Sequence, residues 1–285
     1  MIKSMHSRSI AANAVTYIIL GVLSIIWLLP IVYLVITSFR GEPGAWLDGY
    51  VIPRIWTFEN YTRLFTDTAS FNYPRWFMNT FVVAVFSMLI SSVFVLFTSY
   101  AFARLRFRMR RPMMNIVLVL GMFPGFMSII AVYHLLGLIG LDQSLVALVL
   151  VYSGGAGLGY YVMKGFFDTI PASLDESAYL DGCTKWQTFT KITIPLSRPV
   201  ITYTVLIAFI APWVDFIVAR VVMKDNYDNF TIAVGLWAML DRENLFQWWT
   251  AFCAGAVLVS IPIAALFMMM QKNYVEGITG GSVKG

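Results

Sequence analysis

Asp215 is an acidic residue inside an otherwise apolar stretch, three residues after Pro212 and shortly before Arg220. A carboxylate at membrane depth is costly, and it usually faces a bundle interior or a wet cavity. Two interpretations stay open. Asp215 belongs either to the polar lining of a substrate path or proton relay, or to an internal hydrogen-bond network, with Arg220 as a candidate partner, that only orders the helices.

Aromatic and small polar residues in nearby apolar stretches are further candidates for lining such a path, because aromatic rings can stack on sugar-like rings. For each aromatic residue alone, packing between helices is the commoner role. The candidates are Phe126, Ser128, Tyr133, Tyr203 and Trp213.

Motifs for catalysis or nucleotide binding are missing from the sequence. Residues 153–159 (SGGAGLG) are rich in glycine but lack the lysine of a phosphate-binding loop. Gly155 and Gly159 instead have the spacing that allows close helix packing. There is no HExxH motif, nucleophile elbow or paired-cysteine site. We therefore expect no catalytic residue, metal or cofactor in this chain.

The composition indicates an integral membrane protein. Of the 285 residues, 59% are hydrophobic and 12% are charged, and the mean hydropathy is +0.74. Soluble domains carry about 25% charged residues. The net charge of +5 alone would suggest a nucleic-acid partner. The position of the charges argues against one.

Six apolar segments reach the roughly 20 residues that a helix needs to cross a bilayer. We therefore expect an all-α, polytopic protein. The predicted spans are residues 14–38, 77–101, 113–136, 144–163, 201–223 and 250–271. Six spans put both termini on one side, and the segments of that side hold 13 of the 20 basic residues. The positive-inside rule makes this side cytoplasmic.

Two segments outside the spans have distinct compositions. The basic residues 105–111 (LRFRMRR) are more typical of a topology anchor near anionic lipid than of a nucleic-acid site. Residues 56–65 (WTFENYTRLF) lie in a long outer segment rich in aromatic residues. They predict an amphipathic helix at the membrane–water boundary.

The polar residues 175–199 have the pattern of a cytoplasmic helix–glycine–helix. Ser173 and Glu176 have capping-box spacing, which predicts a helix from about residue 174, and Gly182 suits its C-cap. Thr184 and Gln187 repeat the box, so a second helix should start at once and run toward Pro195. Caps alone leave open whether a partner binds this element or it is a surface loop.

The spacing of Glu176, Ala178, Gly182, Ile192 and Pro195 resembles the E-A-A-x-x-x-G-x(9)-I-x-L-P motif of the permease subunits of ABC importers. Ser177 and Ile194 depart from it. Four further segments resemble the second, G-type permease of maltose/maltodextrin systems. They are residues 164–182, the W-x-D-F of 213–216, FTIAVGL at 230–236 and the tail GITGGSVKG at 277–285. Together with the six spans, the resemblance covers nearly the whole chain.

This resemblance implies that residues 1–285 form one transmembrane domain of an ATP-driven importer. Residues 164–199 would be a coupling loop that docks on an ATPase subunit, and the tail 272–285 would reach toward the ATPase dimer. Glu176 would complete a helix cap or pair with a basic residue of the ATPase. The coupling residues would be Glu176, Ala178, Tyr179, Asp181, Gly182, Trp186, Ile192 and Pro195, and the tail contacts Gly281, Ser282, Val283, Lys284 and Gly285.

The implied partners are a second permease, two ATP-binding subunits that hold ATP and Mg, and an extracytoplasmic sugar-binding protein. The implied cargo is an oligosaccharide, with maltose or maltodextrin favoured, carried by alternating access across the cell membrane of a prokaryote. An ion-coupled secondary transporter using Asp215 is the alternative. The absence of an inverted repeat argues against it, and a non-transporting scaffold is a third reading.

Overall fold

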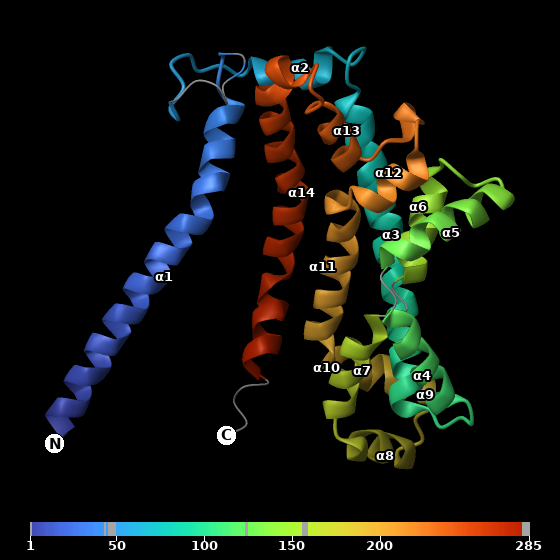
Figure 1. Cartoon of the computed structure of the whole chain (residues 1–285). Helices are drawn as coiled ribbons and strands as arrows, with labels where there is room; N and C mark the ends of the chain where they lie inside the picture. The colour runs from blue at the N-terminus through green and yellow to red at the C-terminus, as the bar shows by residue number, and fades with distance from the viewer. Residues whose placement is uncertain (1, 43, 45–49, 123–124, 156–158, 281–285) are drawn as a thin grey trace. The chain divides into compact units, whose positions relative to one another are not determined.

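The computed structural model describes residues 2–42, 44, 50–122, 125–155 and 159–280, and in these ranges all regular structure is helical apart from one isolated bridge between Arg40 and Trp56. The long helices, shown in Figure 1, are α1 (Ile2–Ser38), α3 (Tyr73–Arg104), α11 (Arg198–Val214) and α14 (Leu245–Gly280). The shorter α-helices are α2 (Glu59–Thr66), α4 (Arg110–Gly121), α5 (Gly125–Leu138), α6 (Leu145–Gly155), α7 (Tyr160–Thr169), α8 (Ala172–Leu180), α9 (Lys185–Thr188), α10 (Ile194–Leu196), α12 (Ile217–Met223) and α13 (Ile232–Ala238). A π-helical turn, η2 (Phe189–Thr193), joins α9 to α10, and a 3-10 turn, η3 (Tyr227–Asn229), precedes α13.

Three helical segments are long and apolar enough to cross a membrane: Asn13–Ser38, Tyr73–Arg104 and Leu245–Lys272. Counting each of two sharply bent helix pairs as one span raises the number among the described residues to five. The all-α membrane architecture is therefore confirmed. The count of six spans stays a prediction.

Three of the predicted spans, 113–136, 144–163 and 201–223, are not single continuous helices among the described residues. The span 144–163 is divided between α6 and α7, with residues 156–158 between them outside the described part. Helices α4 and α5 replace the predicted span 113–136, with residues 123–124 between them outside the described part. The span 201–223 is divided into α11 and α12 at Asp215, whose backbone is extended (φ −82°, ψ 110°). Pro212 lies in the last turn of α11, and a proline inside a helix removes a backbone donor and weakens that turn.

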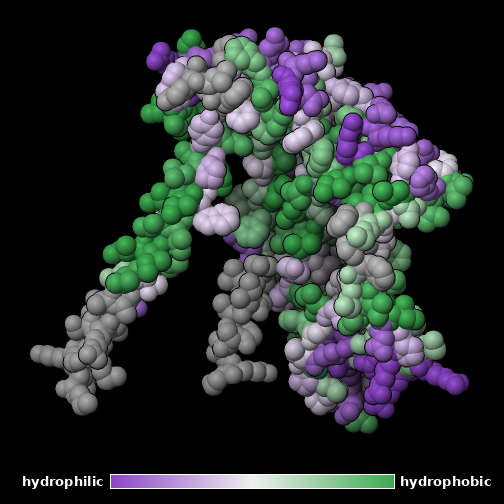
Figure 2. Space-filling view, in the orientation of Figure 1, coloured by the Kyte–Doolittle hydropathy of each residue, from purple (hydrophilic) through white to green (hydrophobic). Residues whose placement is uncertain are grey.

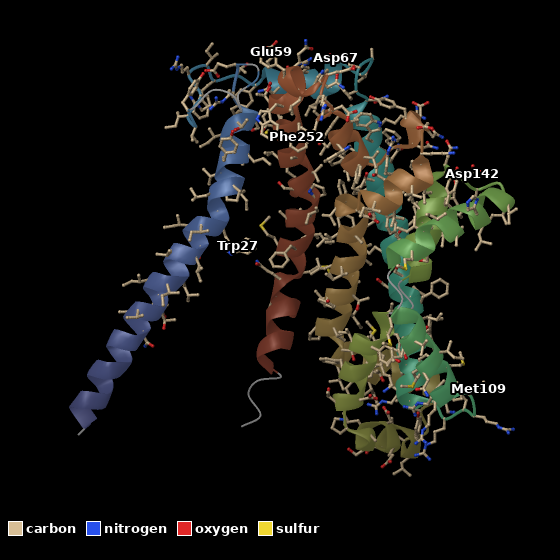
Figure 3. The ribbon with its side chains drawn as sticks, viewed as in Figure 1. Trp27, Glu59, Asp67, Met109, Asp142 and Phe252 are labelled. Atoms are coloured by element: carbon tan, nitrogen blue, oxygen red, sulfur yellow. The ribbon has the colours of Figure 1, made fainter. Side chains whose placement is uncertain are left out.

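The chain forms two compact units, and the first comprises residues 1–71 and 238–258. The predicted interfacial helix is present here as α2, with Glu59 and Asp67 at its two ends in Figure 3. Its buried Asn60 donates to the carbonyl oxygens of Ser38 and Arg40 at 3.0 and 2.7 Å, and it accepts from the Thr250 hydroxyl at 2.8 Å. One amide therefore fastens α2 to the end of α1 and to α14.

Helix α1 exposes its apolar side chains within the first unit. Trp27, which projects from the helix in Figure 3, is 76% exposed, and none of the residues in the most apolar window of Asn13–Ser38 is buried. An apolar helix with no polar face that is not buried by protein is suited to hydrocarbon.

The second unit comprises residues 72–237 and 259–285, and α3 is its central helix. Helices α6, α7 and α11 all pack against α3. At the start of α3, the Trp76 indole donates to the Tyr227 carbonyl at 3.0 Å, and Asn79 donates to the carbonyls of Asp228 and Phe230. The other end of α3 meets α7, α8 and η2.

Polar and apolar surfaces are separated along this second unit. In Figure 2, hydrophilic residues gather over the end that carries α8, and hydrophobic residues cover α5. Met109, labelled in Figure 3, lies in the turn between α3 and α4 at the α8 end, beside Arg108 and Arg110. Under the positive-inside rule, this basic turn favours a cytoplasmic position for the α8 end, and the orientation stays a prediction.

Candidate functional site

Helix α8 ends in a complete Schellman motif centred on Gly182. Gly182 has a φ of +82°, its N–H donates to the Tyr179 carbonyl at 3.0 Å, and the Cys183 N–H donates to the Ala178 carbonyl at 2.9 Å. These two bonds satisfy helix-end carbonyls, and the left-handed backbone favours glycine. The expected C-cap glycine is confirmed.

The second helix starts immediately, as predicted. The Thr184 hydroxyl accepts from the Gln187 N–H at 3.2 Å, and the Gln187 side chain accepts from the Thr184 N–H at 2.7 Å. This reciprocal capping box fixes the start of α9. The helix then continues through η2 to Leu196, with Pro195 in its last turn.

The first predicted capping box is wrong. Helix α8 begins at Ala172, with Pro171 as its N-cap residue and no side-chain cap bond. Ser173 therefore lies inside the helix, and Glu176 is an exposed residue that completes no cap. A proline just before the first turn already provides the fixed φ and the missing N–H that a helix start tolerates.

The helix pair, residues 172–196, presents apolar side chains to solvent. Leu180 is 90% exposed, Trp186 60% and Tyr179 42%. Asp181, Glu176 and Pro195 are also exposed, so polar and apolar groups alternate on this surface. Exposed large apolar groups with a polar rim are typical of a protein-binding surface.

The opposite face of the helix pair is packed into the second unit. Ala178 is 5% exposed, and Phe189 joins a buried cluster with Tyr100 of α3 and Phe167 of α7. Ile192 is half-buried. Of the predicted coupling residues, Ala178 and Ile192 therefore face the protein, and the others lie on or near the outer surface.

Asp215 lies beside a cavity of about 720 Å³ formed by α5, α6 and α12. Ser128 and Tyr152 are the other polar residues of its wall, and the rest of the wall is mainly aliphatic. The Tyr152 hydroxyl is buried and interacts electrostatically with Asp215. The cavity can thus hold a small molecule with few polar contacts.

The carboxylate of Asp215 has a structural task in this fold. Its Oδ1 accepts from the Val218 N–H at 3.1 Å and so satisfies a backbone donor in the first turn of α12, one residue before the N-cap residue Phe216. Arg220 instead donates to the Lys224 carbonyl at 2.6 Å, and no ion pair joins it to Asp215 among the described residues. The suggested Asp215–Arg220 pair is therefore wrong, and Asp215 lies at a helix break rather than within a continuous span.

The remaining path candidates do not gather at this cavity. Tyr133 lines a separate cavity of about 260 Å³ with Arg220 and Lys224. Tyr203 lines another of about 250 Å³. Trp213 is 2% exposed, and its ring packs on Phe77 with centroids 5.1 Å apart. The Phe126 side chain lies outside the described residues.

Tyr152 is the residue that sequence reasoning missed. It lines both the 720 Å³ cavity and the 250 Å³ cavity of Tyr203. The expected close packing at Gly155 and Gly159 is not seen among the described residues, where a Cβ added to either glycine would meet no atom within 4 Å. Gly155 and Gly159 instead leave open space beside these two cavities.

The structure does not test two other predictions, the contacts of the C-terminal tail and the absence of a bound metal. The tail residues 281–285 lie outside the described part of the chain. Among the residues that the structure describes, no three His, Cys, Asp or Glu side chains are grouped to hold a metal ion.

Comparison with known proteins identifies the family. Residues 8–279 match the family model described as "Binding-protein-dependent transport system inner membrane component". The chain belongs to this family. As a binding-protein-dependent inner-membrane component it is a permease subunit, and ATP is hydrolysed by a separate subunit.

Curated relatives of this inner-membrane component match it from end to end. The galactooligosaccharides transport system permease protein GanQ of Bacillus subtilis is 34% identical over 100% of both chains. The maltodextrin permease MdxG of the same organism is 34% identical over 95% of both. The maltodextrin permease MalD of Streptococcus pneumoniae is 32% identical over 100% of both. The resemblance to ABC importer permeases is confirmed.

A solved structure shares the fold. One chain of a bacterial ABC transporter involved in the import of alginate is 23% identical, with a TM-score of 0.73, and the match covers 91% of this chain and 95% of that one. At this identity the likeness supports the fold alone.

Proposed function

We propose that this chain is the transmembrane permease subunit of an ATP-driven importer of oligosaccharides, working by alternating access. Full-length relatives named as permeases for galactooligosaccharides and for maltodextrin support this cargo class. Maltodextrins are our first choice and galactooligosaccharides the second. The whole chain would act as one domain with six spans, both termini cytoplasmic, in the membrane of a prokaryote.

The observation that carries this proposal is the exposed, doubly capped helix pair. Its apolar groups Leu180 and Trp186 face outward, while Ala178 and Phe189 fix it to the second unit. We propose that this outer face docks on an ATP-binding subunit, which holds ATP and Mg, and that Glu176, Tyr179 and Asp181 form the polar part of the contact. The tail 281–285 would touch the ATPase dimer.

The remaining partners would be a second permease and an extracytoplasmic sugar-binding protein. Ser128, Tyr152 and Asp215 are our candidates for the substrate path on this subunit, because they are the polar groups in the wall of the 720 Å³ cavity. The ion-coupled alternative loses its main support, since the Asp215 carboxylate accepts from a backbone N–H in the first turn of α12.

Uptake by the reconstituted complex tests the proposal. Proteoliposomes containing the complex and its binding protein should accumulate radiolabelled maltotriose only with ATP inside, and uptake should survive a protonophore. A parallel assay with galactobiose ranks the two cargo classes. Uptake that needs a proton gradient and proceeds without ATP would contradict the importer. Calorimetry of both sugars with the binding protein checks the ranking independently.

A further inference from the structure

The C-terminal end of α3 contacts both arms of the helix pair, although α3 is separated from it by about 70 residues of sequence. The chain-adjacent helices α7 and α11 are the obvious recipients of any movement of the helix pair. Three side chains of α3 also contact the helix pair and give its movement a second route into the membrane helices. They are Phe97, Tyr100 and Arg104. Their spacing of three and four residues places them on one face of the helix.

Arg104, the last residue of α3, first anchors the end of α7. Its Nη2 donates to the carbonyl oxygens of Phe167 and Ile170 at 2.9 and 2.7 Å. These carbonyls belong to the last turn and C-cap of α7. Helix-end carbonyls lack intrahelical partners, and a cation is favourable there. The guanidinium is therefore held by α7 independently of α8.

The same guanidinium is paired with the first turn of α8. Arg104 Nε lies 3.2 Å from Asp175 Oδ2, and the two side chains are 11% and 10% exposed. An acidic residue in the first turn also suits the positive end of a helix. Removing one partner of a buried ion pair leaves the other charge uncompensated. The pair therefore links the first turn of α8 to the end of α3 by charge, although Arg104 Nε makes no hydrogen bond to a described residue.

The second arm of the helix pair is fixed by Tyr100 and Phe97. The Tyr100 hydroxyl donates to the Lys185 carbonyl of α9 at 3.2 Å, and its ring centroid lies 4.5 Å from that of Phe189. Phe97 stacks on Trp186 with centroids 6.1 Å apart. The face of α3 that carries Arg104 thus grips α8 and α9 on both sides of Gly182.

We propose that Arg104 is a positioning residue that, through Asp175, passes movement of the helix pair to α3. This inference rests on the proposed function, in which an ATP-binding subunit moves the helix pair. Because α3 is a single helix from Tyr73 to Arg104, a displacement of its cytoplasmic end is carried along the helix. Met78 lies about 39 Å from Arg104 along the axis, at 1.5 Å per residue.

The experiment measures movement at the far end of α3 in the complete complex. A reporter cysteine replaces Met78, which is 58% exposed, in a background with Cys183→Ala and Cys253→Ala. Its rate of reaction with a water-soluble maleimide is compared without nucleotide and with vanadate-trapped ADP. The test variant is Asp175→Asn, which removes the charge and leaves the Arg104 bonds to α7. Asp168→Asn is the matched control, because Lys164–Asp168 is an ion pair within α7 alone.

In the parent complex and in the Asp168→Asn control, we expect the maleimide reaction rates without nucleotide and with vanadate-trapped ADP to differ about fivefold or more. Fivefold is the lower end of typical coupling between sites. Asp175→Asn should bring the ratio close to one while the ATP-binding subunit still co-purifies, and Asp175→Glu should restore part of the difference. An unchanged ratio in Asp175→Asn, or no nucleotide dependence in the parent, overturns the role of Arg104. A parent complex that retains no ATP-binding subunit contradicts the proposed function instead.

Discussion

Replacing Gly182 by valine tests whether the geometry of the turn between α8 and α9 determines the affinity for the ATP-binding subunit. Gly182 has a φ of +82°, and a Cβ built on it would meet no atom within 4 Å. The substitution therefore causes no clash in the free subunit. Its cost comes from the left-handed backbone, about 1–2 kcal/mol for a residue with a Cβ.

That cost sets the expected size of the effect. If part of the variant population leaves the native turn geometry, only the remaining fraction can bind the ATP-binding subunit. The apparent affinity is then the native affinity multiplied by that fraction. A penalty of about 1.4 kcal/mol corresponds to a tenfold loss. A cost of about 1–2 kcal/mol thus predicts that Gly182→Val weakens binding of the ATP-binding subunit by a factor of about 5–30 and lowers transport accordingly. Gly182→Asn should be milder, because asparagine tolerates the left-handed region.

The measurement is a titration of the purified permease complex with the ATP-binding subunit, together with membrane yield as a check on insertion. Gly165→Val is the matched control. Gly165 lies in α7, a Cβ there also meets no atom within 4 Å, and its φ is not positive. Wild-type affinity in Gly182→Val, or an equal loss in Gly165→Val, would refute the reasoning from backbone conformation.

Three further predictions concern other parts of the chain. Thr184→Ala should destabilise the start of α9 by about 1 kcal/mol, the usual cost of losing an N-cap, and so lower the thermal midpoint of the complex. Thr190→Ala is the control and should lower that midpoint less, because the Thr190 hydroxyl donates only within its own helix. Asp215→Ala should lower that midpoint more than Asp215→Asn, which keeps an oxygen acceptor for the Val218 N–H; normal uptake by Asp215→Asn would remove the carboxylate charge from the substrate path. Deleting residues 281–285 should change ATP turnover stimulated by the binding protein without reducing membrane yield, and unchanged turnover would show a passive tail.

Local sequence signals predicted the turn of the helix pair well. The Gly182 cap and the Thr184–Gln187 box involve residues at most five positions apart, so their geometry depends little on the rest of the fold. Ser173 had the same spacing to Glu176, but Pro171 started the helix two residues earlier than expected. Competing start signals cannot be ranked by spacing alone.

The sequence could not predict the 720 Å³ cavity or the contacts of α3 with the helix pair, because both depend on which helices pack together. Tyr152 has no motif around it and lines two cavities. In the sequence, nothing separates Arg104 from the other basic residues around it. Its partner Asp175 is about 70 positions away, and nothing local indicates that the two meet.

The back-to-back caps around Gly182 have a consequence for how fast the helix pair can bind and leave a partner. Both helix ends at the turn are satisfied by their own residues, so the turn does not need a partner to complete its hydrogen bonds. A preorganised element loses little conformational entropy when it docks. The helix pair can therefore dissociate from the ATP-binding subunit and bind it again without refolding, as a rigid element of the interface.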